Sequence, residues 1–164
     1  MKTEPFVVSP KTYEPALNVL GVNVTVLASN AHTQGYEITL QSGGEGIGPP
    51  PHRHGWDESF FVLRGSVKFS IDGKAGLCGP GTLVHLPAGT VHSYSFGAGG
   101  GELFEITGQG GNATRMFTHV SHDVPPGPPD VPALTALLRQ EGVTLMLGRV
   151  CDEDRKRQKK DPPT

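Results

Sequence analysis

Short runs of β-forming residues recur along the chain between glycines and prolines, and this rhythm constrains the fold more than any other feature. The 164 residues include 23 glycines and 15 prolines, which separate the runs from one another. Many short strands punctuated by turn residues predict an all-β domain. The expected strands are 22–28, 36–41, 59–63, 67–71, 83–86, 92–96, 103–106 and 115–120.

Turn and helix signals complete this outline. Asp72-Gly73 predicts a hairpin turn, and the glycine-rich segments 97–101 and 108–111 predict loops. One helix is expected near the C-terminus, where Asp130 can cap it and Gly142 can end it. Pro132 suits its first turn, and Leu134, Leu137 and Leu138 share one face. A strand at 143–147 is expected to return to a sheet edge or to a partner chain.

Two segments carry histidines at spacings that suit strands. His52, His54 and Glu58 share one parity, so in a strand their side chains would point to the same face. The segment 83–96 is interpreted as a strand pair with a turn at 87–89, which brings His92 back over the other three. A buried carboxylate needs a compensating charge, and a metal ion would supply it.

Three imidazoles and one carboxylate predict a site for one divalent transition metal ion. This set suits Fe, Mn, Co, Ni, Cu or Zn and does not choose among them. The alternative is a barrel that has these four residues but binds a sugar or nothing. The remaining histidines are expected to be solvated or structural and not ligands: His32, His85, His119 and His122.

The residues around these positions resemble a known family. Gly46-x5-His52-x-His54-x3-Glu58-x6-Gly65 and Gly81-x5-Pro87-x-Gly89-x2-His92 resemble the two signature motifs of the cupin superfamily. The resemblance implies a double-stranded β-helix, the cupin jelly-roll barrel, with the metal in its mouth and a short C-terminal helix. The second motif usually continues to an Asn four residues after its histidine, and Phe96 occupies that place. No ligand is lost by this departure.

The wider pattern resembles the bacterial single-cupin proteins grouped with quercetin 2,3-dioxygenase, over residues 36–147. Three prolines precede His52, and a Pro-Gly-Pro-rich segment leads to the C-terminal helix. The resemblance implies a metal-dependent dioxygenase, an oxidoreductase that uses O2 to open a flavonol or a related enolisable aromatic substrate. In it, His52, His54, Glu58 and His92 would hold the ion, and Glu58 would also take the proton of the substrate hydroxyl.

A substrate pocket is expected beside this site. Phe60, Val62, Tyr94 and Phe96 share strand parity with the ligands and could form an apolar wall, although packing in the core explains them equally well. Tyr36, Gln41 and Met116 are candidates for the mouth.

Three other functions remain open. The first is a non-oxidative cupin metalloenzyme, namely a cyclase, lyase or isomerase that uses Zn or Mn as a Lewis acid. The second is a metal-containing cupin that binds a small molecule as a sensor. The third is a structural barrel that the metal only stabilises.

Length and charge limit the partners. Residues 1–150 are expected to form a single domain, with motifs at 46–65 and 81–96, and residues 151–164 a polar, charged tail. The formal net charge of −2 argues against nucleic acid, and no apolar run is long enough to span a membrane. The absence of a signal-like start predicts a cytoplasmic protein in which Cys78 and Cys151 stay reduced. The family resemblance implies a homodimer.

Overall fold

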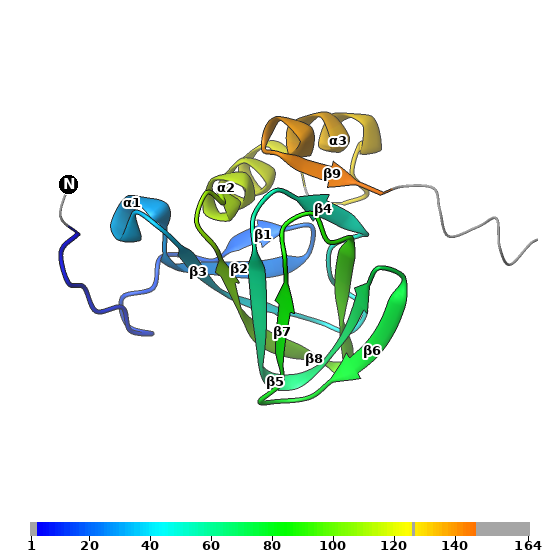
Figure 1. Ribbon diagram of the computed structural model, residues 1–164, viewed down its shortest axis with the longest axis horizontal. Coiled ribbons are helices and arrows are strands. Elements are labelled where there is room, and N and C mark those ends of the chain that lie inside the picture. Colours follow the sequence, from blue (N-terminus) through cyan, green and yellow to red (C-terminus); the bar gives the residue numbers. More distant parts are fainter. Residues whose placement is uncertain (1–2, 126, 147–164) are drawn as a thin grey trace, which may run out of the picture.

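The computed structural model describes residues 3–125 and 127–146. In this part of the chain, 9 strands form one antiparallel sheet that curls into a barrel (Figure 1). The predicted all-β jelly-roll fold is therefore confirmed. The strands are β1 (Leu17–Val19), β2 (Val22–Ala28), β3 (Glu37–Gly43), β4 (His52–His54), β5 (Glu58–Ile71), β6 (Lys74–Cys78), β7 (Leu83–Leu86), β8 (His92–Thr107) and β9 (Val143–Leu145). The expected tail 151–164, with Cys151, lies outside the described residues.

Two long strands, β5 and β8, form the centre of the barrel. They pair along their whole length, from Glu58 opposite Thr107 to Ile71 opposite His92. Strands β6 and β7 pair with β5, and β3 pairs with the second half of β8. Inward-facing side chains of the strands, with two residues of helix 113–123, form the main core: Val22, Val24, Phe60, Val62, Val67, Phe69, Val84, Leu86, Tyr94, Phe96, Leu103, Ala113 and Phe117.

Two predictions about this centre are wrong. The runs 59–63 and 67–71 belong to one strand, and the glycine segment 97–101 lies inside β8 and is not a loop. The glycines let the strand bend without ending, because Gly99 and Gly100 have φ angles of 77° and 82°. Gly65, at φ 70°, faces Gly100 so closely that a Cβ atom there would overlap the Gly100 carbonyl oxygen. The register shifts at this point, between Gly65 and Val67.

The helices also differ from expectation. The described residues form three helices: α1 (Asn30–Thr33), α2 (Ala113–Asp123) and α3 (Val131–Gln140). The sequence predicted only α3. The run 115–120, expected as a strand, lies within α2. Its buried residues Ala113, Phe117 and Val120 are spaced four and three apart, which suits one face of a helix and not of a strand.

The C-terminal helix forms as predicted. The Asp130 side chain accepts a hydrogen bond from the amide of Ala133 at 3.1 Å, and Pro132 lies in the first turn. Gly142 follows the helix with a φ of 82°. The expected next strand is β9, which pairs with β4 at the sheet edge, opposite His52 and His54.

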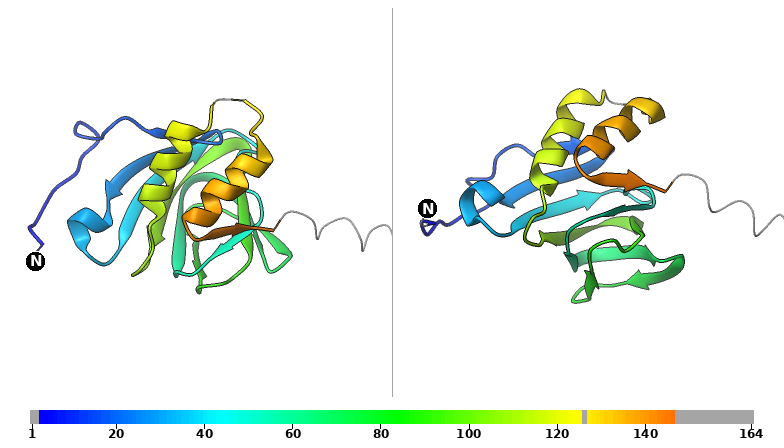
Figure 2. Two further views of the ribbon diagram at one scale, coloured as in Figure 1. Left: turned by 90° about the horizontal axis from the view of Figure 1, so that it is seen from above. Right: turned by 45° about the horizontal axis from the view of Figure 1, so that its top comes forward.

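Helices α2 and α3 and strand β9 cover one end of the barrel, and we call these three elements the cap (Figures 1 and 2). A second apolar cluster joins the cap to the barrel: Trp56, Val120, Leu134, Leu138 and Val143. The carboxylate of Glu141, just after α3, accepts hydrogen bonds from Asn112, Arg115 and His119 at 2.8, 2.9 and 2.7 Å. These bonds tie the two helices of the cap together.

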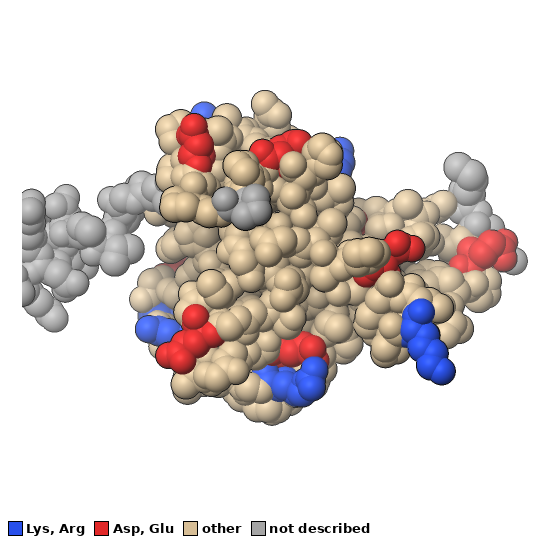
Figure 3. Space-filling model, turned by 180° about the vertical axis from the view of Figure 1, so that it is seen from behind, with Lys and Arg blue, Asp and Glu red and all other residues tan. Residues whose placement is uncertain are grey.

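Charged side chains are dispersed over the surface. On the face in Figure 3, lysines and arginines are separated from one another and alternate with acidic residues around a broad uncharged centre. This face carries no continuous basic stripe among the described residues. Within the same residues, no helix has the length and apolar character needed to cross a membrane.

Candidate metal centre

The four predicted ligands meet at the end of the barrel beneath the cap. His52 and His54 lie on β4, Glu58 is the first residue of β5, and His92 is the first residue of β8. The expected strand pair over 83–96 is wrong, since β7 and β8 each pair with β5 and not with each other. His92 reaches the site because β4 and β8 pair there, with His52 directly opposite His92.

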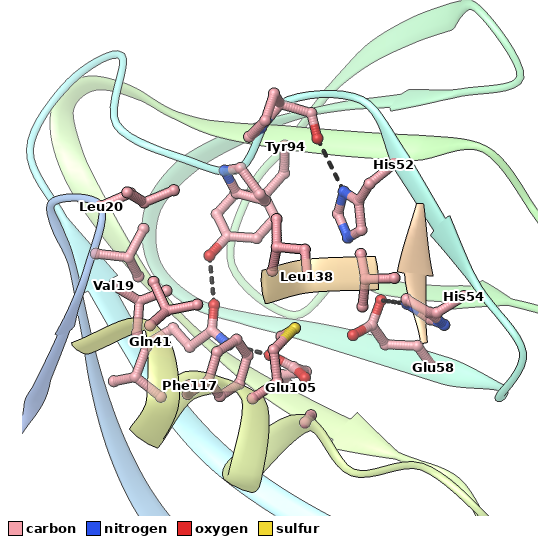
Figure 4. Close-up of a pocket in the computed structure, with 18 of the residues that line it drawn as sticks. Val19, Leu20, Gln41, His52, His54, Glu58, Tyr94, Glu105, Phe117 and Leu138 are labelled. Carbon is pink, nitrogen blue, oxygen red and sulfur yellow. Dashed lines mark hydrogen bonds and ion pairs between the residues drawn. The ribbon is translucent and has the colours of Figure 1, made fainter. Parts of the chain in front are cut away.

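The ring nitrogens of the three histidines face a common point, and the Glu58 carboxylate contacts two of the three rings. One nitrogen from each of His52, His54 and His92 lies within 4.8 Å of the other two. Oε2 of Glu58 lies 3.2 Å from Nε2 of His54 and 3.0 Å from Nε2 of His92. Glu58, His54 and His92 are buried, and His52 is half-buried. Figure 4 shows His54 and Glu58 together, with His52 above them.

The backbone orients all three imidazoles in the same way. Nδ1 of His52, His54 and His92 lies 2.8, 3.0 and 3.0 Å from the carbonyl oxygens of Pro50, Trp56 and Thr90. A carbonyl can only accept, so each Nδ1 carries the proton and donates it. When the ring is neutral, Nε2 is left with a free lone pair, which is the form that coordinates a metal ion.

Burial and neighbouring charges shift the ionisation of these groups. Burial opposes charge on Glu58, but hydrogen bonds and charge from His54 and His92 outweigh it, so the pKa of Glu58 is lowered. Burial, followed by the charge of His92, lowers the pKa of His52 from 6.5 to about 4. Burial also opposes charge on His92, but the adjacent Glu58 carboxylate outweighs it and raises that pKa. At neutral pH, Glu58 is an anion and His52 a neutral donor.

This arrangement fits a divalent transition metal ion. Nε2 of His92 is buried and forms no hydrogen bond of good geometry among the described residues, although Oε2 of Glu58 lies 3.0 Å away. Three neutral nitrogen donors and one carboxylate oxygen are a common ligand set for such ions. The ring of Trp56 stacks on that of His54, with centroids 4.2 Å apart and planes at 7°, and supports the ligand from behind. His52, His54 and His92, with Glu58, could therefore hold an ion here.

The other histidines lie elsewhere. His85 is bonded to Ser59, His119 to Glu141 and His122 to Asp123, at 2.9, 2.7 and 2.9 Å. His32 lies beside Ser29 at the start of α1. None of them belongs to the histidine group found among the described residues.

A cavity of about 80 Å³ adjoins the metal centre. Of the predicted pocket residues, Phe60, Tyr94 and Met116 line it, as does Gln41. Tyr36 is 47 % exposed and does not line the cavity, while Val62 and Phe96 are buried in the barrel core. The cap supplies a large part of the apolar wall: Ala113, Met116, Phe117, Val120, Leu138, Val143 and Leu145.

Sequence reasoning named Tyr94 and Gln41 as pocket residues but missed Glu105, which joins them in this cavity. The Tyr94 hydroxyl donates to Oε1 of Gln41, and Nε2 of Gln41 donates to Glu105 (Figure 4). Burial and then the charge of Glu58 raise the pKa of Glu105 well above its ordinary value, and burial and then Glu105 raise that of Tyr94. The available signal was parity, because Glu105 lies two residues after the inward-facing Leu103.

Comparison with known proteins agrees with the fold. The cupin domain model matches residues 36–103. Quercetin 2,3-dioxygenase of Bacillus subtilis (strain 168) is 31% identical over 107 residues. That match covers 63% of this chain but only 32% of the length of the Bacillus protein.

Two solved structures illustrate the likeness of the barrel. The polyketide cyclase RemF from Streptomyces resistomycificus superimposes with a TM-score of 0.55 at 18% identity, covering 64% of this chain and 80% of that one. An RmlC-like cupin from Shewanella frigidimarina NCIMB 400 superimposes with a TM-score of 0.56 at 15% identity, covering 66% of this chain and 95% of that one. At these identities the likeness shows the fold alone. The domain match over residues 36–103 and the 31% identity to the Bacillus relative support a cupin superfamily member that resembles quercetinase-like proteins.

Proposed function

We propose that this protein is a metal-dependent enzyme in which His52, His54, Glu58 and His92 hold one divalent ion and Glu58 takes a proton from a substrate hydroxyl. The observation that carries the proposal is the convergence of three imidazoles, two of which contact Glu58. Each imidazole turns Nδ1 toward a backbone carbonyl and so directs Nε2 toward the site. Side chains packed only for stability have no need for three unprotonated nitrogens beside a buried carboxylate.

Each residue has a defined task in this proposal. The bound ion would act as a Lewis acid that lowers the pKa of a substrate hydroxyl at an open coordination position. Glu58 lies in the wall of the cavity beside His54 and His92, so it is placed to accept that proton. The apolar side chains of the cap exclude bulk water, which strengthens the interaction between Glu58 and the reacting hydroxyl.

The first candidate reaction is the dioxygenation of a flavonol or a related enolisable aromatic compound. The quercetin 2,3-dioxygenase relative supports it through the identity that it shares with 63% of this chain. Removal of the hydroxyl proton by Glu58 would leave an electron-rich anion that can react with O2. O2 and a small aromatic substrate are the partners that this reaction requires.

The second candidate is a non-oxidative reaction, a cyclase, lyase or isomerase step, on a small oxygenated molecule. The size of the cavity favours it. The volume of about 80 Å³ is smaller than the roughly 150 Å³ of an engineered cavity that accepts one benzene molecule. A three-ring flavonol would enter only after the cap moves, whereas a small molecule would enter as the cavity stands.

Metal analysis followed by oxygen uptake tests the proposal. Protein purified without added metal is analysed for Fe, Mn, Co, Ni, Cu and Zn, and is then reconstituted with each ion in turn. Oxygen consumption coupled to the loss of quercetin would support the dioxygenase. Reconstituted protein that leaves both oxygen and quercetin unchanged would exclude that reaction and favour the non-oxidative one.

A pair of variants tests the ligand assignment itself. His54→Ala is expected to lower the metal content strongly and to leave the barrel folded, because the ring occupies one corner of the histidine group. His85→Ala is the matched control, since His85 lies outside that group and bonds only to Ser59 among the described residues. Equal metal content in both variants would refute the assignment.

A further inference from the structure

A hydrogen-bonded chain of three buried side chains lines the cavity beside the metal centre, and we call it the polar chain: Tyr94, Gln41 and Glu105. Tyr94 donates to Gln41, and Gln41 donates to Glu105 and, at 3.2 Å, to Thr39. Figure 4 shows the polar chain on one side of the pocket and His52, His54 and Glu58 on the other. The cavity thus has two polar sides and an otherwise apolar lining.

The polar chain has no evident task in holding the barrel together. Glu37, which is equally buried, makes a useful contrast. Its carboxylate accepts from the amides of Asn30 and Thr114 at 3.2 and 3.0 Å, so it satisfies the first turns of α1 and α2. Members of the polar chain bond only to other side chains and satisfy no backbone group. Buried polar groups are costly, so their position on a cavity wall indicates contact with a ligand.

The hydrogen bonds already made determine what the polar chain can still bind. Both amide protons of Gln41 and the hydroxyl proton of Tyr94 are committed within the protein. On these two residues, only the oxygens of Tyr94 and Gln41 can form further hydrogen bonds, and they can do so only as acceptors. A ligand group that binds there must therefore donate a hydrogen bond, as a hydroxyl does.

Charge excludes another class of ligand. The residues that line the cavity include Glu58 and Glu105 and neither lysine nor arginine. A carboxylate or phosphate placed against the polar chain would find acceptors and no cationic side chain. The group that faces the polar chain is therefore not an anion.

We infer that the ligand of this site is a small molecule that carries two hydroxyl groups and no anionic group. One hydroxyl binds at the metal centre and gives its proton to Glu58, and the second donates to the oxygens of Tyr94 and Gln41. The cavity of about 80 Å³ limits the molecule to a few non-hydrogen atoms. This inference rests on the proposed metal centre and adds to it the class of substrate.

Three three-carbon probes test the inference on cobalt-loaded protein whose metal content is measured first. Propan-1-ol has one hydroxyl and propane-1,2-diol has two. Lactate has a carboxylate in place of the terminal CH2OH group of the diol. Binding is followed by the visible absorption of cobalt and by the fluorescence of Trp56, the single tryptophan, which stacks on His54. The diol is expected to bind about tenfold more tightly than propan-1-ol, as one additional hydrogen bond predicts. Lactate is expected to bind more weakly than the diol.

Tyr94→Phe locates the second contact. It removes only the hydroxyl, so it should weaken binding of the diol about tenfold and leave propan-1-ol unchanged. Tyr13→Phe, at a residue that does not line the cavity, should change neither affinity. Gln41→Met, which removes the other acceptor, is expected to have the same selective effect and serves if Tyr94→Phe fails to fold.

The possible results separate this inference from the proposed function. Protein that takes up no cobalt would refute the metal centre itself. Two results with fully cobalt-loaded protein would overturn the inference and leave the metal centre intact. In the first, the native protein binds lactate as tightly as the diol. In the second, Tyr94→Phe weakens the binding of propan-1-ol and of the diol by the same factor.

Discussion

Replacement of Leu138 by alanine tests how firmly the cap is packed on the barrel. Leu138 is 7 % exposed, lies in the cluster with Trp56 and Val143, and forms part of the cavity wall. Leu138→Ala removes three buried carbon atoms, worth about 2.4 kcal/mol at about 0.8 kcal/mol each. The space left unfilled adds about 1 kcal/mol, so the free energy of unfolding should fall by about 3 kcal/mol.

Urea unfolding of the metal-free protein, followed by Trp56 fluorescence, measures this loss, and thermal unfolding should show Tm lower by roughly 6–12 °C. Leu137→Ala is the matched control in the same helix, because Leu137 is half-buried and does not line the cavity. It should lose less than half as much. Equal losses in the two variants, or a loss below about 1 kcal/mol for Leu138→Ala, would refute the packing of α3 over the cavity. A wider cavity should also admit larger ligands than the native protein does.

Three other substitutions have definite expected outcomes. Glu58→Gln should reduce turnover about 100-fold or more and change substrate affinity little, when the two proteins are compared at equal metal content. Unchanged turnover would show that Glu58 does not take part in the proton transfer. Gly65→Ala should lower the free energy of unfolding by about 3 kcal/mol in urea, because the added Cβ is strained at positive φ and also overlaps a carbonyl oxygen. Gly73→Ala is the control: its Cβ would meet open space, so its free energy of unfolding should fall by only about 1 kcal/mol. Burial raises the pKa of Glu141, but His119 and Arg115 outweigh it and lower that pKa below 4.5. The stability that Glu141→Gln removes at pH 7 should therefore disappear as the pH falls below 4.5, and a loss that does not depend on pH would contradict this role.

Much of the metal centre could be predicted because it depends on local geometry. His52 and His54 are two residues apart, and two residues apart in a strand means the same face whatever the strand pairs with. The capping of α3 by Asp130 and its end near Gly142 also depend on neighbours within a few residues. The Asp72-Gly73 turn joins β5 and β6 for the same reason.

Errors arose where distant segments decide the local structure. The glycine segment 97–101 has the composition of a loop, but pairing with β5 on one side keeps it in a strand. The run 115–120 contains residues that suit strands, and only the barrel beneath it favours the helical face of Phe117 and Val120.

The sequence by itself determined the all-β class, the ligand types and the parity of His52, His54 and Glu58, because strand periodicity and side-chain chemistry are local properties. Only the tertiary structure decided that His92 lies opposite His52, that Glu105 and Gln41 meet Tyr94 in the same cavity, and that the cap leaves about 80 Å³ beside the metal centre. The physical reason is that these features depend on which strands pair and how helices pack, and such contacts join residues far apart in the chain.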